Sequence, residues 1–495
     1  MFMWSGSSSS SSQGRPFRVR HVYVKGNKRT KKDLLAPCMS PIFAARTAEE
    51  VSSGLLEAMR DLKHLDVFKS VRFILEDVSE PEDNRSCDLI VQVEEKKMWS
   101  LGVMTTTTVE GEEQELEGNV ALSNPFGRGE RLSLTTRIGA HWTEYRNNSF
   151  QVSYTKPLWA HYFATRQQQP HQQPQPLRVF EWQAGRSSHD LFHSGVTQRT
   201  LSSSLVYAIG SRHQFRYEGA WREVLPFSDA ASKIRLEAGH SLKSSLIHRY
   251  MVDKRDDPVL PTRGWAVQSH HELAGLGGDV RFLKGETAAQ VNYPLGWGCS
   301  LNALAKGGFV VPLFGDKTRV IDRFFLGGPL SLRGFEPCGV GPRQSSTVTF
   351  LLFHTSFGLF SVASLFNLSL IPLPFFSTNP KGNALGGELY LSESLHFTFP
   401  LPLPNIPSFV KGHVFAHGGS LLPLSTGSDE ENARGQELIK QRMEKLWKER
   451  RTTVGLGLVF STVFGRVELN ATRPIDKQPQ DLTRWWQIGL SASFL

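Results

Sequence analysis

Clustered cysteines, nucleotide-binding motifs and residue patterns typical of catalytic sites are missing from this 495-residue sequence. The four cysteines show no CxxC pair and no metal-ligand spacing, so a zinc site is not predicted. There is no Walker loop or dinucleotide fingerprint. Ser188-His189-Asp190 is adjacent in sequence, which is not how catalytic triads are assembled, and His270-His271-Glu272 would be split across two faces of a strand. We therefore expect no enzyme, no cofactor and no metal.

Overall hydrophobicity is also low. Hydrophobic residues make up 39% of the chain and the mean hydropathy is −0.28, which argues against a helical membrane protein. It does not argue against a membrane β-barrel, whose strands alternate apolar and polar residues. No positively charged segment followed by an apolar run opens the chain, so we expect no secretory signal. The net charge of +9 is modest for this length and favours anionic lipid or acidic partners over nucleic acid.

The N-terminal part predicts a small α+β domain over 17–97, after a disordered Ser-rich tail over 1–16. We expect, in order, a strand over 17–24, a helix over 30–35, a helix over 47–64, and strands over 68–75 and 87–94. Thr30 can cap the first helix, which Pro37 and Pro41 are expected to end. Thr47 followed by Glu50 is a capping-box pattern for the second helix.

From Met98 onward the pattern changes to a period of two. Polar and charged residues recur on one face of strand after strand, as they would around a water-filled lumen. About sixteen strands can be counted, an even number typical of single-chain outer-membrane barrels. We predict strand starts near Met98, Gln114, Arg131, Ser149, Leu177, Arg199, Gln214, Lys233, Gly264, Arg281, Ser300, Gly387, Phe409, Thr453, Gly465 and Trp485. The fold class is thus an all-β transmembrane barrel over 98–495.

Three insertions interrupt the barrel pattern, over 160–177, 345–383 and 420–450. The first contains a Gln/Pro/His tract with no folding signal. The second has no charged residue from 355 to 378; it is long enough to span a bilayer as a helix, but that would break a closed sheet. It is either a loop insertion or an unspliced segment. The third contains a charged helix that we expect to lie over the barrel mouth.

The most specific motif is Arg323-Phe-Phe-Leu-Gly-Gly-Pro-Leu-Ser-Leu-Arg-Gly-Phe335. Its glycines permit sharp reversals, so the segment predicts a compact loop that presents an arginine. An ordinary glycine-rich surface loop would have the same local composition. The loop residues that we single out are Arg323, Phe324, Gly327, Gly328, Arg333, Gly334 and Phe335.

With its supporting motifs at 124–129, 260–264 and 386–388, this loop resembles the barrel-assembly factors of bacterial, mitochondrial and chloroplast outer membranes. Members carry polypeptide-transport-associated (POTRA) domains before a sixteen-stranded barrel. The single N-terminal domain and the missing signal favour the mitochondrial branch, the core barrel of the sorting and assembly machinery. The resemblance covers about 17–495, apart from the insertions.

The resemblance implies that the arginine loop enters the lumen and pairs with acidic residues on neighbouring strands. A buried guanidinium needs such a partner. Glu388 is our first candidate partner of Arg333, with Phe415 and His417 beside it. His417 stands where the family often has an acid. Strict alternation would point the Glu393 side chain toward lipid. A bulge near Ser392, or a position at the membrane interface, would explain a charged residue here.

The resemblance also implies a lateral seam between the first and last barrel strands, which receives a client's last strand. The end of the chain resembles the mitochondrial β-signal, with a polar residue, a glycine and two spaced hydrophobic residues. An ordinary strand that closes the barrel would show the same residues. The candidate seam and signal residues are Trp99, Leu101, Val103, Gln487, Gly489, Ala492 and Phe494.

Three functions follow as hypotheses. The first is a mitochondrial outer-membrane insertase for β-barrel precursors, which works with other subunits of the sorting and assembly machinery and has its N-terminal domain in the intermembrane space. The second is a protein-translocating pore of the chloroplast-import or secretion type. The third is a structural tether that holds an inner-membrane organising complex. All three place the chain in a lipid bilayer, and none involves nucleic acid.

Overall fold

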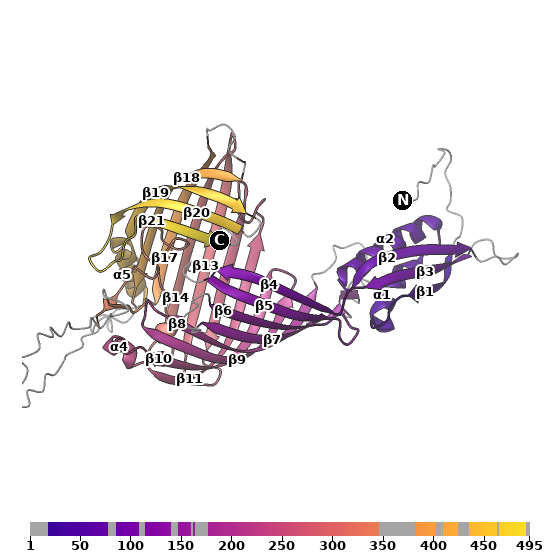
Figure 1. Ribbon diagram of the computed structural model, residues 1–495, viewed down its shortest axis with the longest axis horizontal. Helices are drawn as coiled ribbons and strands as arrows, with labels where there is room; N and C mark the ends of the chain where they lie inside the picture. Colours follow the sequence, from indigo (N-terminus) through magenta and orange to yellow (C-terminus); the bar gives the residue numbers. More distant parts are fainter. Residues whose placement is uncertain are drawn as a thin grey trace, which may run out of the picture.

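The computed structural model describes residues 18–77, 86–107, 114–139, 147–159, 162–163, 177–345, 382–401, 407, 409–423, 435–462 and 465–491. Within these ranges a small domain of strands and two helices lies beside a barrel of long strands (Figure 1). The tail over 1–16, the Gln/Pro/His tract and almost all of the apolar insertion lie outside the described residues.

The N-terminal domain has the predicted order of strand, helix, helix, strand, strand. Its elements are β1 (Arg18–Lys25), α1 (Lys32–Ala44), α2 (Ala48–His64), β2 (Phe68–Asp77) and β3 (Ser86–Glu95). β3 is the central strand, parallel to β1 and antiparallel to β2. Ile42 of α1 and Leu62 of α2 are buried in the same cluster as Leu89 and Val91 of β3, so both helices contribute to one core with the sheet.

The predicted end of the first helix is wrong, because α1 continues through both Pro37 and Pro41 to Ala44. A proline inside a helix removes a hydrogen bond and costs about 3 kcal/mol. Five buried side chains offset that cost, each contributing roughly 1.5–3 kcal/mol: Leu34, Leu35, Cys38, Met39 and Ile42. The second helix is as predicted: Thr47 accepts from the Glu50 N–H at 3.2 Å, and α2 ends at His64.

Thr30 does not cap α1; it joins the N-terminal domain to the barrel. Its hydroxyl donates to Glu95 at 2.8 Å and accepts from the Asn124 amide at 3.0 Å. Asn124 begins the 124–129 turn of the barrel, and the Lys31 N–H donates to the Gly127 carbonyl of that turn at 2.8 Å. This motif turn is therefore the docking site of the small domain.

Apolar contacts reinforce the same junction. Trp159 and Phe163, which follow the fourth barrel strand, are buried in one cluster with the N-terminal core. A Cβ on Gly129 would lie 2.8 Å from the Trp159 indole nitrogen, so only glycine leaves room for that ring. Phe163 belongs to the predicted insertion over 160–177, and this part of the insertion packs into the junction.

The barrel is a single sixteen-stranded antiparallel sheet, as predicted. Its strands are β4 (Trp99–Thr107), β5 (Gln114–Ser123), β6 (Arg131–Gly139), β7 (Asn148–Pro157), β8 (Arg178–Leu191), β9 (Val196–Ile209), β10 (His213–Pro226), β11 (Gly239–Asp253), β12 (Gly264–Ala274), β13 (Phe282–Gly296), β14 (Cys299–Pro312), β17 (Leu389–Pro400), β18 (Val410–Leu422), β19 (Arg451–Thr462), β20 (Gly465–Asp476) and β21 (Trp486–Ser491).

Every predicted strand start except one lies within three residues of the observed one. The exception is Lys233, which lies in a short helix, α4 (Ser232–Arg235), six residues before β11 begins. Ile234 of this helix is buried against Val196 and Val224, and the chain turns into β11 at Gly239, whose φ is +113°. The alternating pattern could not show that this apolar residue serves a connection.

The barrel wall has an apolar outer face and a polar inner face. Outward side chains such as Trp221, Val291 and Leu456 are exposed, whereas Asn302 and Asn470 are buried inside. This alternation is expected of a wall with lipid on one side and a polar lumen on the other. None of the helices in the described part of the chain is long and apolar enough to cross a membrane.

The described parts of the other insertions border the arginine loop and the outer wall. β15 (Arg343–Gln344) pairs with β16 (Asn383–Ala384), so the ends of the 345–383 insertion are held together. The third insertion contains the predicted helix, α5 (Gly435–Lys448). The Ser420 hydroxyl of β18 donates to the Leu446 carbonyl of this helix at 2.6 Å.

Glu393 is explained by the segment that follows α5. The β17 ladder is regular on both sides of Glu393, so no bulge turns this residue inward. Its carboxylate instead pairs with Arg450, whose guanidinium lies over Gly418 on the same face of the wall. Arg450 also lies 4.9 Å from the Trp447 ring centroid. The end of α5 therefore leans on the outer wall rather than lying only over the mouth.

Candidate functional site: the arginine loop and the barrel seam

The loop between β14 and β17 folds back on itself through glycines. Gly327, Gly328 and Gly334 have φ values of +122°, +101° and +89°, which other residues rarely adopt. A Cβ on Gly327 would lie 2.3 Å from the Glu336 carbonyl oxygen. Leu332 and Phe335 are fully buried, so the motif forms a packed element rather than an exposed surface loop.

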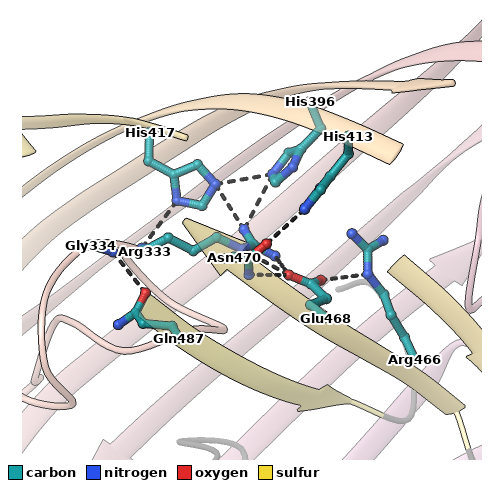
Figure 2. Close-up of polar contacts among 9 residues, drawn as sticks. All are labelled: Arg333, Gly334, His396, His413, His417, Arg466, Glu468, Asn470 and Gln487. Carbon is teal, nitrogen blue, oxygen red and sulfur yellow. Dashed lines mark hydrogen bonds and ion pairs between the residues drawn. The ribbon is translucent and has the colours of Figure 1, made fainter. Parts of the chain in front are cut away.

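Arg333 at the tip of this loop is held by a buried carboxylate on β20 (Figure 2). Its Nε and Nη2 atoms donate to Glu468 Oε2 at 2.9 and 2.5 Å. Arg466 and Asn470, two residues to either side on β20, also contact the Glu468 carboxylate, at 2.5 and 2.9 Å. One carboxylate therefore lies between two guanidinium groups.

Two of the three predicted partners do contact Arg333. Arg333 Nη1 lies 2.9 Å from His417 Nε2, and its guanidinium lies 5.2 Å from the Phe415 ring centroid. His396 joins this group, with Nε2 at 3.1 Å from His417 Nε2 (Figure 2). The histidine at the often acidic position supplies a hydrogen bond, and the negative charge comes from another strand.

The prediction that Glu388 is the countercharge of Arg333 is wrong. Glu388 pairs with Arg323 at 3.2 Å and accepts from the Thr318 hydroxyl at 2.5 Å. Its side chain has the predicted inward parity, but it lies at the start of β17. Arg333 approaches the same strand at His396, eight residues further along, which corresponds to about 26 Å.

Glu468 was not singled out from the sequence. Alternation places it on the same polar face as Arg466 and Asn470, so its inward direction was predictable. Its pairing with Arg333 was not, because the two residues are separated by 135 positions and meet only through the path of the loop across the lumen. The available signal was an acidic residue at an inward position of the penultimate strand, where it could have been proposed as a partner of Arg333.

The root of the loop is clamped to the opposite part of the wall. Asp322 accepts two hydrogen bonds from the Arg222 guanidinium of β10, at 2.6 and 3.2 Å, and both side chains are buried. Lys284 of β13 donates to the Asp322 carbonyl at 3.0 Å. The next residue, Arg323, pairs with Glu237 at 3.1 Å as well as with Glu388. The loop thus runs from β10 and β13 at its root to β20 at its tip.

The first and last barrel strands form an incomplete seam. The sheet order runs from β21 to β4, and within the described ranges no backbone pairing joins these two strands. The side chains of Trp99, Leu101 and Val103 on β4 are 62–68% exposed. The described part of β21, Trp486–Ser491, pairs with β20 and with no other described strand. The predicted seam residues Ala492 and Phe494 lie outside the described residues.

The inner side of β21 is covered by the arginine loop. Gln487 is buried and bonds to the loop backbone, and Gly489 faces Pro329. A cavity of about 600 Å³ adjoins this strand. Its lining residues are Pro329, Pro337, Leu469, Arg484, Trp486, Gln487 and Ile488. The cavity therefore touches both the loop and the free edge of the seam.

Within the described part of the chain, no three His, Cys, Asp or Glu side chains are grouped to hold a metal ion. Glu95, which lies outside the membrane-spanning strands, has a lowered pKa. Burial of Glu95 opposes its ionisation, but hydrogen bonds from Thr30 and Arg29 outweigh this and lower its pKa below 4.5. The junction with the N-terminal domain is thus built on a stable carboxylate.

Comparison with known families gives the group to which this architecture belongs. The Omp85 superfamily domain matches residues 124–494. The chain belongs to the Omp85 superfamily. The match begins at the motif turn that docks the N-terminal domain and includes the arginine loop and the last strands. The resemblance inferred from the motifs is therefore confirmed.

Relatives of similar length include the Sorting and assembly machinery component 50 homolog of Xenopus tropicalis, 30% identical over 96% of this chain and 90% of the relative. The human protein of that name is 29% identical, again over 96% and 90%. The SAM50-like protein of Schizosaccharomyces pombe is 28% identical over 97% and 91%.

A solved structure shares the fold. BamA from Haemophilus ducreyi lacking POTRA domains 1–3 aligns with a TM-score of 0.68 and 15% identity, over 96% of this chain and 84% of that one. The alignment includes almost the whole chain, so the likeness in fold extends over the small N-terminal domain as well as the barrel.

Proposed function

We propose that this chain is a mitochondrial outer-membrane insertase that folds β-barrel precursor proteins at the seam between β4 and β21. The observation that carries the proposal is the seam itself: β4 and β21 lie at the two ends of the sheet without pairing in the described ranges, and β21 is supported from inside by the arginine loop. The relatives named as sorting and assembly machinery components support the mitochondrial location.

The exposed edge of β4 suits the addition of a strand. Backbone N–H and C=O groups along a sheet edge can pair with an extended segment, and side-chain alternation fixes the register. Leu101 and Val103 offer apolar side chains to such a segment. A client strand added here would pair its backbone with β4, which satisfies these polar groups in the membrane, and its alternation would turn its apolar face toward lipid.

The arginine loop favours the seam over the lumen as the client route. The loop crosses the interior from Asp322 near β10 to Arg333 on β20, and buried ion pairs hold both ends. A translocating pore would require this element to move aside and to separate both buried ion pairs. Insertion at the seam leaves them in place. The proposed function therefore needs no open channel.

The proposal includes partners and an orientation. β-Barrel precursors are the clients, and other subunits of the sorting and assembly machinery are the expected neighbours. We place the N-terminal domain in the intermembrane space and α5 on the cytosolic side. Tethering of an inner-membrane organising complex through that domain is compatible with insertion.

Reconstitution tests the proposal directly. The purified full chain in phosphatidylcholine–phosphatidylethanolamine liposomes is mixed with an unfolded mitochondrial β-barrel precursor. We expect the precursor to gain protease protection and heat-modifiable gel mobility faster than with protein-free liposomes. Glu393→Gln, which alters an outer-wall pair away from the seam, serves as the control variant. Equal rates with and without the chain would overturn the proposal.

A further inference from the structure

The described part of the last strand makes a short pairing with the sheet. Among the residues that the structure describes, β21 pairs with β20 over six residues, from Trp486 to Ser491, whereas β19 and β20 pair over most of twelve-residue strands. Within the described part of the chain its other edge has no partner. The position of β21 must therefore be fixed partly by something other than its neighbour in the sheet.

Gln487 supplies that support through both ends of its amide. Its Oε1 accepts from the Gly334 N–H at 2.8 Å (Figure 2). Its Nε2 donates to the Phe335 carbonyl at 2.6 Å. The side chain is 5% exposed, so both bonds are shielded from water. An amide is the uncharged side-chain group that offers a donor and an acceptor in this arrangement.

The chain leading into β21 extends the same contact. The Arg484 N–H donates to the Gly334 carbonyl at 3.0 Å, and the Glu336 N–H donates to the Leu482 carbonyl at 2.8 Å. Phe335 and Thr483 form an isolated β-bridge. The arginine loop thus acts as a short extra strand beside 482–484, and Gln487 continues this contact onto the strand itself.

Gly489 completes the fit between the loop and the strand. A Cβ at this position would lie 3.3 Å from Pro329 Cβ and 3.5 Å from Leu330 Cδ2. Gln487 and Gly489, the inward positions described on β21, therefore both face the loop. Arg333 meanwhile holds Glu468, which is the register partner of Gly489 on β20.

We infer that Gln487 is a positioning residue that latches the seam strand onto the arginine loop, so that the loop sets the position of the edge offered at the seam. This inference rests on the proposed function for its consequence, but the latch itself is a property of the resting protein. The arginine and the latch act on adjacent strands: Arg333 fixes β20 and Gln487 fixes β21.

Amide hydrogen exchange tests the latch without any client. The full chain is compared with Gln487→Met, which keeps the side-chain length but removes both bonds, and Gln487→Glu, which keeps the acceptor and places a carboxylate oxygen at the Phe335 carbonyl. We expect exchange over 486–491 to be about tenfold faster in both variants. Gln487→Met loses two modest hydrogen bonds, whereas Gln487→Glu loses one and sets a carboxylate oxygen against a carbonyl oxygen. Exchange in β19 is expected to be unchanged.

Gln480→Ala is the matched control, since Gln480 is exposed and lies just before the same strand. Unchanged exchange over 486–491 in Gln487→Met would overturn the latch, and so would equal acceleration throughout the barrel, because a general packing role would loosen β19 as well. If Gln487→Glu does not fold, Gln487→Met decides the matter alone.

A precursor-insertion assay separates the latch from the proposed function. We expect Gln487→Met to insert a β-barrel precursor more slowly than Gln480→Ala, with barrel stability unchanged. Accelerated exchange together with a wild-type chain that inserts nothing would support the latch and overturn the insertase. Normal exchange in Gln487→Met with an active wild type would do the reverse.

Discussion

Arg333 at the tip of the arginine loop and Glu468 on the penultimate strand form a buried ion pair across 135 residues of sequence. The guanidinium uses two nitrogens on one carboxylate oxygen, and Arg466 holds the other oxygen. An element that enters the lumen from one connection is thereby fixed to the strand beside the seam. The pair links the motif of the family to the place where we propose that clients enter.

Removal of either partner should slow insertion, and the two losses should differ. Arg333→Ala leaves Glu468 paired with Arg466, whereas Glu468→Ala leaves two buried guanidinium groups without their carboxylate. Breaking a buried pair from one side costs about 3–5 kcal/mol, so Glu468→Ala should lower the thermal midpoint further. Thermal unfolding followed by heat-modifiable mobility measures the order of the two variants.

Two further variants show whether the contact is direct. Arg333→Lys should recover only part of the insertion rate, since an ammonium cannot make both contacts. The exchange Arg333→Glu with Glu468→Arg should recover more than either change alone. Glu388→Gln is the matched control, because this acid pairs with Arg323 at the loop root. A larger effect of Glu388→Gln than of Arg333→Ala would show that the tip contact is unimportant.

Deletion of 347–378 should leave membrane integration intact. The insertion begins and ends beside the β15–β16 pair, in which Arg343 faces Ala384, and β14 pairs directly with β17 across this connection. Resistance to alkaline extraction measures integration. Recovery of the deleted protein in the soluble fraction would show that the segment is structural.

The N-terminal domain should be protected in intact mitochondria. An even number of strands places the two ends of a barrel on one side of the membrane, opposite the connection that contains α5. Protease added outside should cut near α5 and spare 18–95 until the outer membrane is ruptured. Cleavage within 18–95 in intact organelles would contradict this topology.

The N-terminal domain should lose stability in acid. The folded pKa of Glu95 lies below the usual 4.5, so its bonds to Thr30 and Arg29 contribute stability at neutral pH and lose it as the pH falls through the folded value. The urea midpoint of the domain in the full chain should be constant from about pH 8 to 5 and fall below about pH 4. Glu95→Gln should lower the midpoint at pH 7 and flatten this dependence; an unaltered acid response in that variant would assign it to other groups.

The sequence predicted the barrel well because strand alternation is a local property. Each strand carries its own inward and outward faces, so sixteen strands and the parity of Glu388 or Gln487 could be predicted without knowing their neighbours. The start predicted at Lys233 shows the limit of this approach. The apolar residue next to it, Ile234, is buried in a connection and fits the alternating pattern of a strand. Pro37 and Pro41 show a second limit. Local propensity predicts that the helix ends at these prolines, but burial of its apolar side chains stabilises it through both.

The candidate site was less predictable because it depends on depth and on the path of a loop. Parity gives the direction of a side chain but not its height in the barrel. Glu388 and Glu468 both point inward, and only the course of the loop from Asp322 to Arg333 decides which one the guanidinium meets. The latch of Gln487 is likewise a contact between a side chain and the backbone of a distant loop, which no pattern along the chain encodes.

Site-specific photocrosslinking tests the central claim, that clients enter at the seam. A photoreactive residue is placed at Val103 on β4, at Leu246 on the outer wall away from the seam, or at Gln151, whose strand neighbour Phe150 faces outward. During insertion of a radiolabelled β-barrel precursor, we expect its last strand to crosslink to position 103 and not to 246 or 151. Crosslinks chiefly at position 151, inside the lumen, would contradict the seam and favour a translocating pore.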